Sequence, residues 1–551
     1  MNEFNREKAL RRLAEEEFDV VVVGGGVTGA GVALDAASRG LRTALVERAD
    51  FASGTSSKSS KLVHGGLRYL SQRDFRLVYE ALAERQRLLD NAPHLVHALP
   101  FLIPLYGGKT IAKALNSALW LYDLTGGVRI GKRHKRISVD DTLAHMPMLR
   151  RKGLAAGFLY YDARADDARL TLTLVRTAVL DHGAVAANYA GVTGILRDGS
   201  AAAGVRAGEI DVRAKAVVNA TGVWADEVRA LDEGVHPRVI RPAKGIHISV
   251  PLEKVQNDIA VVIPVLKDKR SIFVVPWGDR VYVGTTDTDY DGPLDNPTVT
   301  KADIAYLLEA VNAFLTEPLA TDDILGTWAG LRPLVARAQS ERTADLSRRH
   351  QVTRSASGVV TVTGGKLTTY RRMAADTVDA VVDGLDGRKS RSRTKKLPLR
   401  GAAGAGALSE PGAGARFGVD DAVLAHLAGR YGSEARTLAA MIAREPALGE
   451  PLIASLPYVR AEAVYAARYE MAQNLEDVLA RRTRALLLAR DECTAAADDV
   501  AALLAPERGW DDAEVRGQAA GFRDLVARER ASAERDGPGD VVADALAGTT
   551  P

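Results

Sequence analysis

A glycine-rich turn between two short apolar segments near the N-terminus constrains this fold more than any other feature. Residues 18–23 (FDVVVV) are apolar and β-branched, as a strand inside a parallel sheet is, and the turn GGGVTG follows over residues 24–29. A helical pattern over residues 30–39 stops at a glycine, and residues 42–46 form a second strand-like segment. The order strand, turn, helix and strand predicts an α/β fold that begins with a Rossmann-like unit.

The spacing of the glycines, and the acid that follows the second strand, predict a dinucleotide site. Glycines in GxGxxG spacing permit a tight turn and a close approach of the pyrophosphate, the helix N-terminus supplies N–H groups, and the acid accepts from a ribose hydroxyl. A turn that binds nothing is the alternative, and the complete context argues against it. FAD and NAD both fit this unit. The cofactor contacts expected here are Gly24, Gly26, Val27, Thr28, Gly29 and Glu47.

The segment GTSSKSSKLVHGGLRYL, residues 54–70, favours FAD over NAD. After the acid a nicotinamide enzyme usually continues to a third strand, whereas this chain enters a polar loop that can lie along a longer cofactor. Its hydroxyls can donate to phosphate and ribityl oxygens, and its paired glycines let backbone approach a flat ring. A solvated serine-rich loop is the alternative, but it leaves the interleaved apolar residues unexplained. The contacts expected from this loop are Thr55, Ser56, Ser59, Lys61, Leu62 and His64.

Two later segments have the pattern of a strand that ends in a glycine turn. They are AKAVVNATGVWAD (214–226) and GVVTVTGGKLTTYRRMA (358–374), and the second is expected to aim a helix N-terminus and Lys366 at the cofactor. An ordinary turn is the alternative for each. The further cofactor contacts expected from these turns are Ala220, Thr221, Gly222, Trp224, Gly365, Lys366, Leu367 and Thr368.

Charge and cysteine content exclude several function classes. Lys and Arg total 73 against 70 Asp and Glu, and no basic stripe with interleaved aromatics is present, so we expect no nucleic-acid partner. The single cysteine, Cys493, gives no disulfide framework and no cysteine-rich metal site, so we expect no metal and a reducing, cytoplasmic compartment. The charged N-terminal segment lacks the apolar core of a secretory signal, and no apolar run is long enough to span a bilayer.

Taken with four further segments, these motifs resemble the FAD-dependent glycerol-3-phosphate dehydrogenase family. The further segments are KGIHISVP (244–251), VPWGDRVYVGTTDTDYDG (275–292), WAGLRPL (328–334) and LPYVRAEAVYAARYEMAQNLEDVLARRTR (456–484). The resemblance implies a D-amino-acid-oxidase-like flavoprotein that oxidises sn-glycerol 3-phosphate to dihydroxyacetone phosphate and passes electrons to a quinone. It also implies a peripheral position on the cytoplasmic face of the cell membrane, while a homodimer stays open.

The expected architecture is a Rossmann-like FAD-binding half, a mixed-sheet substrate half and an all-α C-terminal domain. The oxidoreductase domain is expected over residues 15–390. Its FAD-binding parts are expected at about 18–75, 155–235 and 350–390, and its substrate parts at about 76–154 and 236–349. A Gly, Ala and Pro-rich stretch indicates a linker over 391–418, and apolar periodicity then indicates helices over 419–535, before a flexible tail over 536–551.

Oxidation of a secondary alcohol requires a base for the hydroxyl proton and cations for the phosphate. Two histidines carried over from the family motifs are candidates for the base, and we prefer His247 to His64, because the sheet over the flavin should carry the substrate face. Arg332 is the first choice for the phosphate, since the planar guanidinium matches it. Arg349 competes with its neighbour Arg348 for a second position. The catalytic set is His247, Arg332 and Lys366, and the substrate-binding set is Arg68, Tyr69, Arg332, Arg348 and Lys366.

One segment could meet a membrane surface. The segment KTIAKALNSALWLYDLTGG (109–127) places Ile111, Leu115, Ala118, Leu119 and Tyr122 at helical spacing, and the basic run KRHKR follows over 132–136. An interfacial helix beside anionic lipid is one reading, and a helix packed on its own core is the other. A quinone acceptor favours the first reading.

Two rival functions remain at this point. An oxidase of the same family would pass electrons to oxygen, but such relatives carry an insertion between the GLRPL and GGKLTTY motifs, and only residues 335–363 intervene here. A non-catalytic flavin-binding interaction protein is the other rival, and its flavin would not respond to substrate.

Overall fold

The computed structural model describes residues 3–67, 74–268, 270–335, 349–385 and 390–535. Its FAD-binding half is built on a six-stranded sheet that is parallel except at β19, where the pairing is antiparallel. The four central valines of β2 are buried, as in a sheet covered on both faces. The strands, in spatial order, are β19 (Gln351–Arg354), β20 (Val360–Thr363), β12 (Val217–Asn219), β2 (Val20–Val23), β3 (Thr43–Val46) and β8 (Val185–Ala187).

Helices and a small sheet pack around this core. Helix α2 contacts both α7 and α10, and the first strand of the small sheet directly precedes β2. The helices are α1 (Arg6–Glu15), α2 (Val27–Ser38), α7 (Asp167–Leu180), α8 (Ala225–Glu233) and α10 (Tyr370–Val382). The small sheet has the order β1 (Glu17–Phe18), β11 (Ile210–Ala214), β10 (Ala201–Ala207) and β9 (Val192–Asp198).

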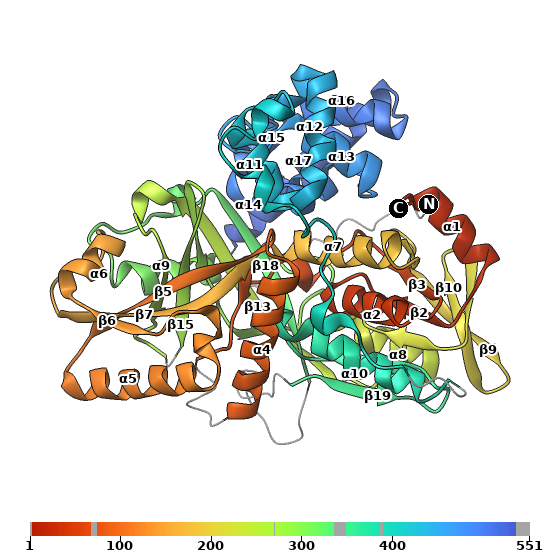
Figure 1. Ribbon diagram of the computed structural model, residues 1–551, viewed down its shortest axis with the longest axis horizontal. Helices are drawn as coiled ribbons and strands as arrows, with labels where there is room; N and C mark the ends of the chain where they lie inside the picture. Colours follow the sequence, from red (N-terminus) through yellow and green to blue (C-terminus); the bar gives the residue numbers. More distant parts are fainter. Residues whose placement is uncertain (1–2, 68–73, 269, 336–348, 386–389, 536–551) are drawn as a thin grey trace.

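The substrate half is a mixed ten-stranded sheet beside the FAD-binding half (Figure 1). Its path is β17 (Thr288–Asp289), β13 (Ile240–Pro251), β16 (Arg280–Gly284), β15 (Ser271–Trp277), β14 (Ala260–Pro264), β5 (Val96–Tyr106), β7 (Leu154–Ala165) and β4 (Leu62–Val63). Off this path, β18 (Gly326–Val335) pairs with β13, and β6 (Lys135–Ile137) pairs with β7. Its helices are α4 (Phe75–Asn91), α5 (Lys109–Leu124), α6 (Val139–His145) and α9 (Lys301–Asn312).

Two strands of this sheet fall in ranges that the sequence assigned to the FAD-binding half. They are β4, within 18–75, and β7, which lies almost wholly within 155–235. Strand β4 continues directly from the polar loop, and it pairs with β7 as the edge of the substrate sheet. The two halves therefore share a boundary inside the polar loop, and this loop joins one sheet to the other.

The C-terminal domain is helical and lies above both halves in Figure 1. Its helices are α11 (Asp421–Tyr431), α12 (Ala435–Arg444), α13 (Arg460–Tyr469), α14 (Ala485–Leu488), α15 (Arg490–Ala495), α16 (Ala497–Arg508) and α17 (Asp512–Ala533), with a π-helical turn over Asp477–Arg482. Residues 391–418 contain only short 3-10 turns, yet Leu399 and Leu408 are buried, so this stretch packs against the domains that it joins. The tail expected over 536–551 lies outside the described residues.

Among the described residues, none of the helices combines the length and the apolar character that crossing a bilayer requires.

Candidate active site

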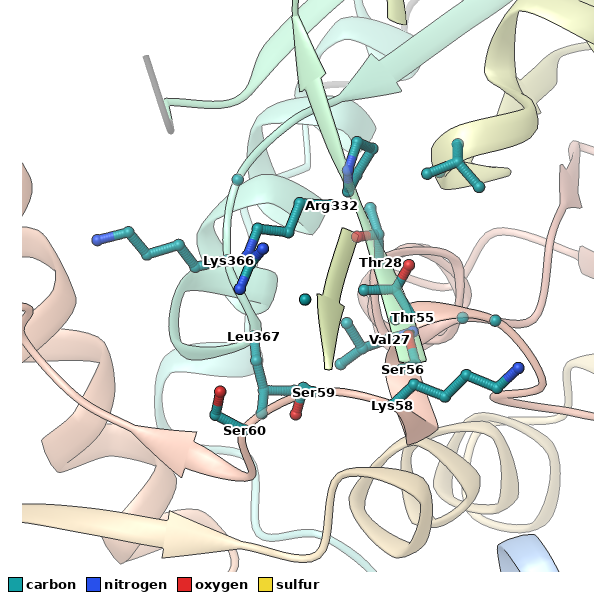
Figure 2. A pocket seen from close by; sticks show the side chains of 18 of the residues that line it. Val27, Thr28, Thr55, Ser56, Lys58, Ser59, Ser60, Arg332, Lys366 and Leu367 are labelled. Atoms are coloured by element: carbon teal, nitrogen blue, oxygen red, sulfur yellow. The ribbon is translucent and has the colours of Figure 1, made fainter. Parts of the chain in front are cut away.

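A cleft of about 1900 Å³ opens between the two halves and receives residues from both. The FAD-binding half contributes the glycine turn after β2, the end of β12 and the turn after β20, and the sheet of the substrate half contributes β13 and β18. The polar loop between the halves lines the same space. Figure 2 shows Arg332, Lys366, Thr55 and Ser59, which come from these separate segments, arranged around one volume.

The glycine turn has the geometry that its spacing predicted. Gly26 is the N-cap of α2, and Val27 N–H donates to Ser56 Oγ at 2.8 Å, so the polar loop closes over the helix N-terminus. A Cβ on Gly29 would lie 1.9 Å from the carbonyl oxygen of Gly24, so only glycine permits this approach. Gly29 therefore shapes the turn from beneath and does not line the cleft.

Glu47 lines the cleft beside the glycine turn. Its Oε2 accepts from Gly25 N–H at 2.6 Å, and its Oε1 accepts from Ala49 N–H at 2.8 Å, which fixes the carboxylate beside the glycine turn. Burial raises the pKa of Glu47, and the two backbone donors offset part of that rise. A carboxylate held in this way keeps lone pairs for the hydroxyls of a ribose.

The donors around the cleft fit FAD. A helix N-terminus suits a pyrophosphate, and the hydroxyls of Thr55 and Ser59 stand on the same cleft. Space is also left where side chains are absent, since a Cβ on Gly222 would meet nothing within 4 Å. The other expected contacts that line the cleft are Gly24, Gly26, Val27, Thr28, Glu47, Ser56, Leu62, His64, Ala220, Thr221, Trp224, Gly365, Lys366, Leu367 and Thr368.

Lys61 differs from its expected place. It does not line the cleft, because its amino group turns beneath the loop to the Ser57 carbonyl oxygen at 3.1 Å and to Asp167 Oδ1 at 3.2 Å. Burial first, and then the neighbouring Arg484, lower the pKa of Lys61 to about 8. Lys61 therefore stabilises the conformation of the loop through Ser57 and Asp167.

His247 is held in the wall of the cleft. Its side chain is 2% exposed, its Nε2 lies 2.9 Å from Ser60 Oγ, and its ring stacks on Trp328. Burial, followed by Lys61 and Arg332, holds the pKa of His247 well below its usual range. The ring is thus a neutral imidazole at neutral pH, and its Nδ1 has no hydrogen-bond partner among the described residues. When Nε2 carries the ring proton and donates it to Ser60 Oγ, Nδ1 has the free lone pair and can accept a proton.

Arg332 extends from β18 beside His247, and the fork of its guanidinium is oriented by neighbouring polar groups. Nη1 donates to Asp287 Oδ1 at 3.2 Å, and Nη2 donates to Thr285 Oγ1 at 3.2 Å and to the Thr286 carbonyl oxygen at 3.0 Å. A Cβ on Gly245 would lie 2.4 Å from Nη2, so this glycine provides the room that the fork occupies.

Asp287 is a site residue that the sequence reasoning missed. It lines the cleft and orients Arg332, and it belongs to the VGTTDTDYDG segment that carried part of the resemblance. Only the paired strands show which of the four acids in VPWGDRVYVGTTDTDYDG faces the arginine.

The remaining predicted residues have three different outcomes. His64 lines the cleft near Phe273, and its backbone N–H donates to Thr368 Oγ1 at 3.1 Å, which ties the polar loop to the turn that carries Lys366. Arg349 points elsewhere, to Asp74 at the start of α4, and does not line the cleft. Arg68, Tyr69 and Arg348 lie outside the described residues.

Comparison with known proteins agrees with this geometry. A family model described as FAD dependent oxidoreductase matches residues 19–371, and one described as the C-terminal domain of alpha-glycerophosphate oxidase matches residues 392–515. The glycerol-3-phosphate dehydrogenase 2 of Mycobacterium tuberculosis is 44% identical over 555 aligned residues, which cover 99% of this chain and 94% of that relative. This chain belongs to the glycerol-3-phosphate dehydrogenase family of FAD-dependent oxidoreductases.

Solved structures support the membership. The crystal structure of glycerol-3-phosphate dehydrogenase from Bacillus halodurans, complexed with FAD, has a TM-score of 0.77 and 31% identity and covers 96% of this chain and 97% of that one. An L-alpha-glycerophosphate oxidase from Mycoplasma pneumoniae has a TM-score of 0.55 at 18% identity, covers 70% of this chain and 99% of that one, and shows a shared fold alone. FAD is the cofactor of this family member.

Proposed function

We propose that this chain oxidises sn-glycerol 3-phosphate to dihydroxyacetone phosphate, with the hydride passing to FAD and the electrons then passing to a quinone. One observation carries the proposal: Arg332 on β18 and His247 on β13 stand on paired strands over the cleft that also contains the dinucleotide turn. The names of the similar Mycobacterium and Bacillus proteins support the choice of substrate.

FAD, when bound, accepts the hydride. The chain itself has to supply the group that accepts the proton of the substrate hydroxyl. His247 is the side chain proposed for this role, because it lines the cleft and its lowered pKa keeps the ring unprotonated when substrate arrives. The same shift makes it a weaker base than a free imidazole, so its fixed position has to supply part of its effect. The hydrogen bond to Ser60 and the stacking on Trp328 hold the ring in one orientation. The imidazole therefore does not have to rotate before it accepts the proton.

The phosphate of the substrate requires a cation that is already oriented. Arg332 is half-buried and supported by Asp287, so its fork is fixed before the ligand enters. Lys366 lines the same cleft and brings a second positive charge to it, with its amino group extending away from the Arg332 fork in Figure 2. A neutral polyol would gain little from either cation, which makes the phosphate the group that selects the substrate.

Absorbance of the bound flavin tests the reaction and its acceptor. Under anaerobic conditions, glycerol 3-phosphate should bleach the oxidised-flavin band, and a soluble quinone should restore it quickly. Oxygen alone should restore the band slowly. A flavin that ignores the substrate would refute the enzyme proposal, and recovery in oxygen as fast as in quinone would identify an oxidase.

The quinone acceptor leads to a proposed contact with the membrane through α5. Leu119 and Tyr122 bury one face of this helix in the core, while Trp120 and Leu124, four residues apart on the opposite face, are 46% and 78% exposed. Ile111 is 57% exposed because it lies near the start of the helix, although it falls on the same side as Leu119 and Tyr122. The exposed pair supports the interfacial reading for the outer face. Four exposed cations of the KRHKR segment follow it, and such cations favour anionic lipid. We place the protein on the cytoplasmic face of the cell membrane.

Vesicle binding tests this placement. The holoenzyme should co-sediment with phosphatidylglycerol vesicles more than with phosphatidylcholine vesicles, and the double variant Trp120→Ser, Leu124→Ser should reduce the bound fraction several-fold. The control is Val235→Ser, since Val235 is 64% exposed and lies outside α5. Equal binding by both variants would remove α5 from the contact.

A further inference from the structure

An arginine-rich segment of the C-terminal domain, residues 481–484 (RRTR), contacts the polar loop of the FAD site. This segment ends the π-helical turn and precedes α14, which contacts β13 and β18. Its arginines are almost fully buried, and Arg482 and Arg484 are each about 1% exposed. Buried charges are costly unless they are paired, so their partners indicate what the segment holds in place.

Arg484 binds the polar loop directly. Its Nη2 donates to the carbonyl oxygen of Ser57, and the same nitrogen lies 3.0 Å from Asp167 Oδ1. Lys61 donates to these same two residues from within the loop. The guanidinium from the C-terminal domain and the amino group from the loop thus share both acceptors, and the loop backbone is fixed between them.

Asp167 extends this support toward the reacting groups. Its Oδ2 accepts from Ser59 N–H at 3.0 Å and from Ser59 Oγ at 2.6 Å. Ser59 lines the FAD cleft, and the next residue, Ser60, holds His247. A continuous series of contacts therefore runs from Arg484, outside the oxidoreductase domain, to the residues around the cofactor.

The chain that leads into the loop is held in the same way, through Asp50. Arg482 makes a two-pronged contact with Asp50, with Nη1 to Oδ2 at 2.6 Å and Nη2 to Oδ1 at 2.9 Å, and Arg481 Nε adds a third bond at 2.8 Å. Burial alone would raise the pKa of Asp50, but the two arginines lower it overall. Asp50 lies between Glu47 and the start of the loop at Gly54, so the segment holds the chain that leads into the loop as well as the loop itself.

We propose that Arg484 is a positioning residue for FAD binding, and that the C-terminal domain completes the FAD site by fixing the loop over residues 54–61. This role rests on the FAD site alone and not on the identity of the substrate. The domain is then required for cofactor affinity and does more than enlarge the protein.

A matched control is available at the same domain boundary. Arg176, on α7, is also buried, and it joins the C-terminal domain by donating to Glu434 Oε1 and to the Tyr465 hydroxyl, each at 3.0 Å. It makes no contact with the polar loop in the described structure. Loss of Arg176 should weaken the boundary between the domains as much as loss of Arg484, without releasing the loop.

The test compares Arg484→Met with Arg176→Met in full-length protein stripped of FAD. Titration with FAD should give a Kd raised about tenfold or more for Arg484→Met, as loss of a charge-assisted hydrogen bond predicts, and within about twofold of wild type for Arg176→Met. Both variants should lower the Tm of the apoprotein. Arg484→Lys, which keeps the charge without the fork, should fall between wild type and Arg484→Met, and it serves if the methionine variant does not fold.

Two results would overturn the proposal. An unchanged FAD Kd in Arg484→Met, or in Arg484→Lys where only the latter folds, would show that the loop is fixed without the arginine. An equal rise of the Kd in Arg176→Met would show that any weakening of the domain boundary has this effect. A failure to oxidise glycerol 3-phosphate would leave these binding results unaffected.

Discussion

His247 lies flat on Trp328, with ring centroids 4.8 Å apart and ring planes within 9° of parallel. The Nζ of Lys61 also lies 4.8 Å from the centre of the same indole ring. One tryptophan on β18 therefore contacts both the proposed base and the cation beneath the polar loop. The indole and Ser60 together leave the imidazole a single orientation, and the first prediction tests what that orientation contributes.

Ser60→Ala should lower kcat/KM for glycerol 3-phosphate by about tenfold, because the ring keeps its basic nitrogen and loses one orienting hydrogen bond. His247→Asn should cost more, about a hundredfold to ten-thousandfold, since the proton acceptor itself is removed. Steady-state kinetics on holoenzyme of matched FAD content measure both. A Ser60→Ala variant as impaired as His247→Asn would assign the proton transfer to the serine instead.

Gly245→Ala should impair substrate binding without changing any charge. The new Cβ would lie 2.4 Å from Arg332 Nη2 and 2.6 Å from Thr285 Oγ1, and the flexible arginine is the group that can move away. We expect KM for glycerol 3-phosphate to rise about tenfold, as loss of one well-placed charged contact predicts, with FAD content unchanged.

Gly194→Ala is the control for this substitution. It also adds a methyl group to a strand, but its Cβ would meet nothing within 4 Å. Its KM should match the wild-type value. A similar rise of KM in both variants would indicate a general effect of the added methyl group on the sheets, and the displaced fork would no longer explain the result.

Local sequence patterns were sufficient for the glycine turn and much of the cofactor cleft. Gly24, Gly26 and Glu47 are close in sequence, and the conformation of one strand–turn–helix unit determines how they meet. The resemblance placed Arg332 and His247 in separate motifs, and the pairing of β13 with β18 brings those motifs together.

Long-range contacts account for what the sequence could not provide. Lys61 is predicted as a cofactor contact together with the other residues of its loop, but its charge is paired with Asp167, more than a hundred residues further along the chain. The support from Arg484 was missed for the same reason, since nothing in the spacing of RRTR shows which buried acceptors face it. Residue type indicates that a buried charge needs a partner, and only the fold selects that partner.

The stability of the protein should depend on pH through Glu529 on α17. Burial raises the pKa of Glu529 to about 7, against the partial offset of Lys58. Between pH 4.5 and 7 the folded state thus holds a proton that the unfolded state has lost. The stabilisation is fully present below the unfolded pKa and is lost as pH rises through 7.

Glu529→Gln removes this dependence, so the variant should be more stable than wild type at pH 8, and their difference should shrink toward pH 4. Chemical denaturation at a series of pH values measures the slope. Asp524→Asn removes an exposed acid from the same helix and serves as the control for the loss of a carboxylate as such. A wild-type slope that persists in Glu529→Gln would assign the titration to another group.

The last prediction concerns Arg332 and tests the class of substrate. A charge-assisted hydrogen bond contributes about 1.5–3 kcal/mol, so loss of the fork should lower kcat/KM for glycerol 3-phosphate by about tenfold or more. Arg332→Met keeps most of the apolar stem, and FAD content should survive because the hydrogen bonds of Arg332 to Asp287, Thr285 and Thr286 lie within the substrate half. Unphosphorylated glycerol does not use the fork, so its slow oxidation should change much less.

Arg349→Met is the matched control, because this exposed arginine pairs with Asp74 and does not line the cleft. Its kinetics should match wild type with both substrates. Equal losses for glycerol 3-phosphate and glycerol in Arg332→Met would mean that the arginine supports the fold or the flavin, because a phosphate contact cannot affect a substrate without phosphate. No loss with either substrate would move the phosphate to Lys366 and to cations outside the described residues, since the fork would then be spent on Asp287.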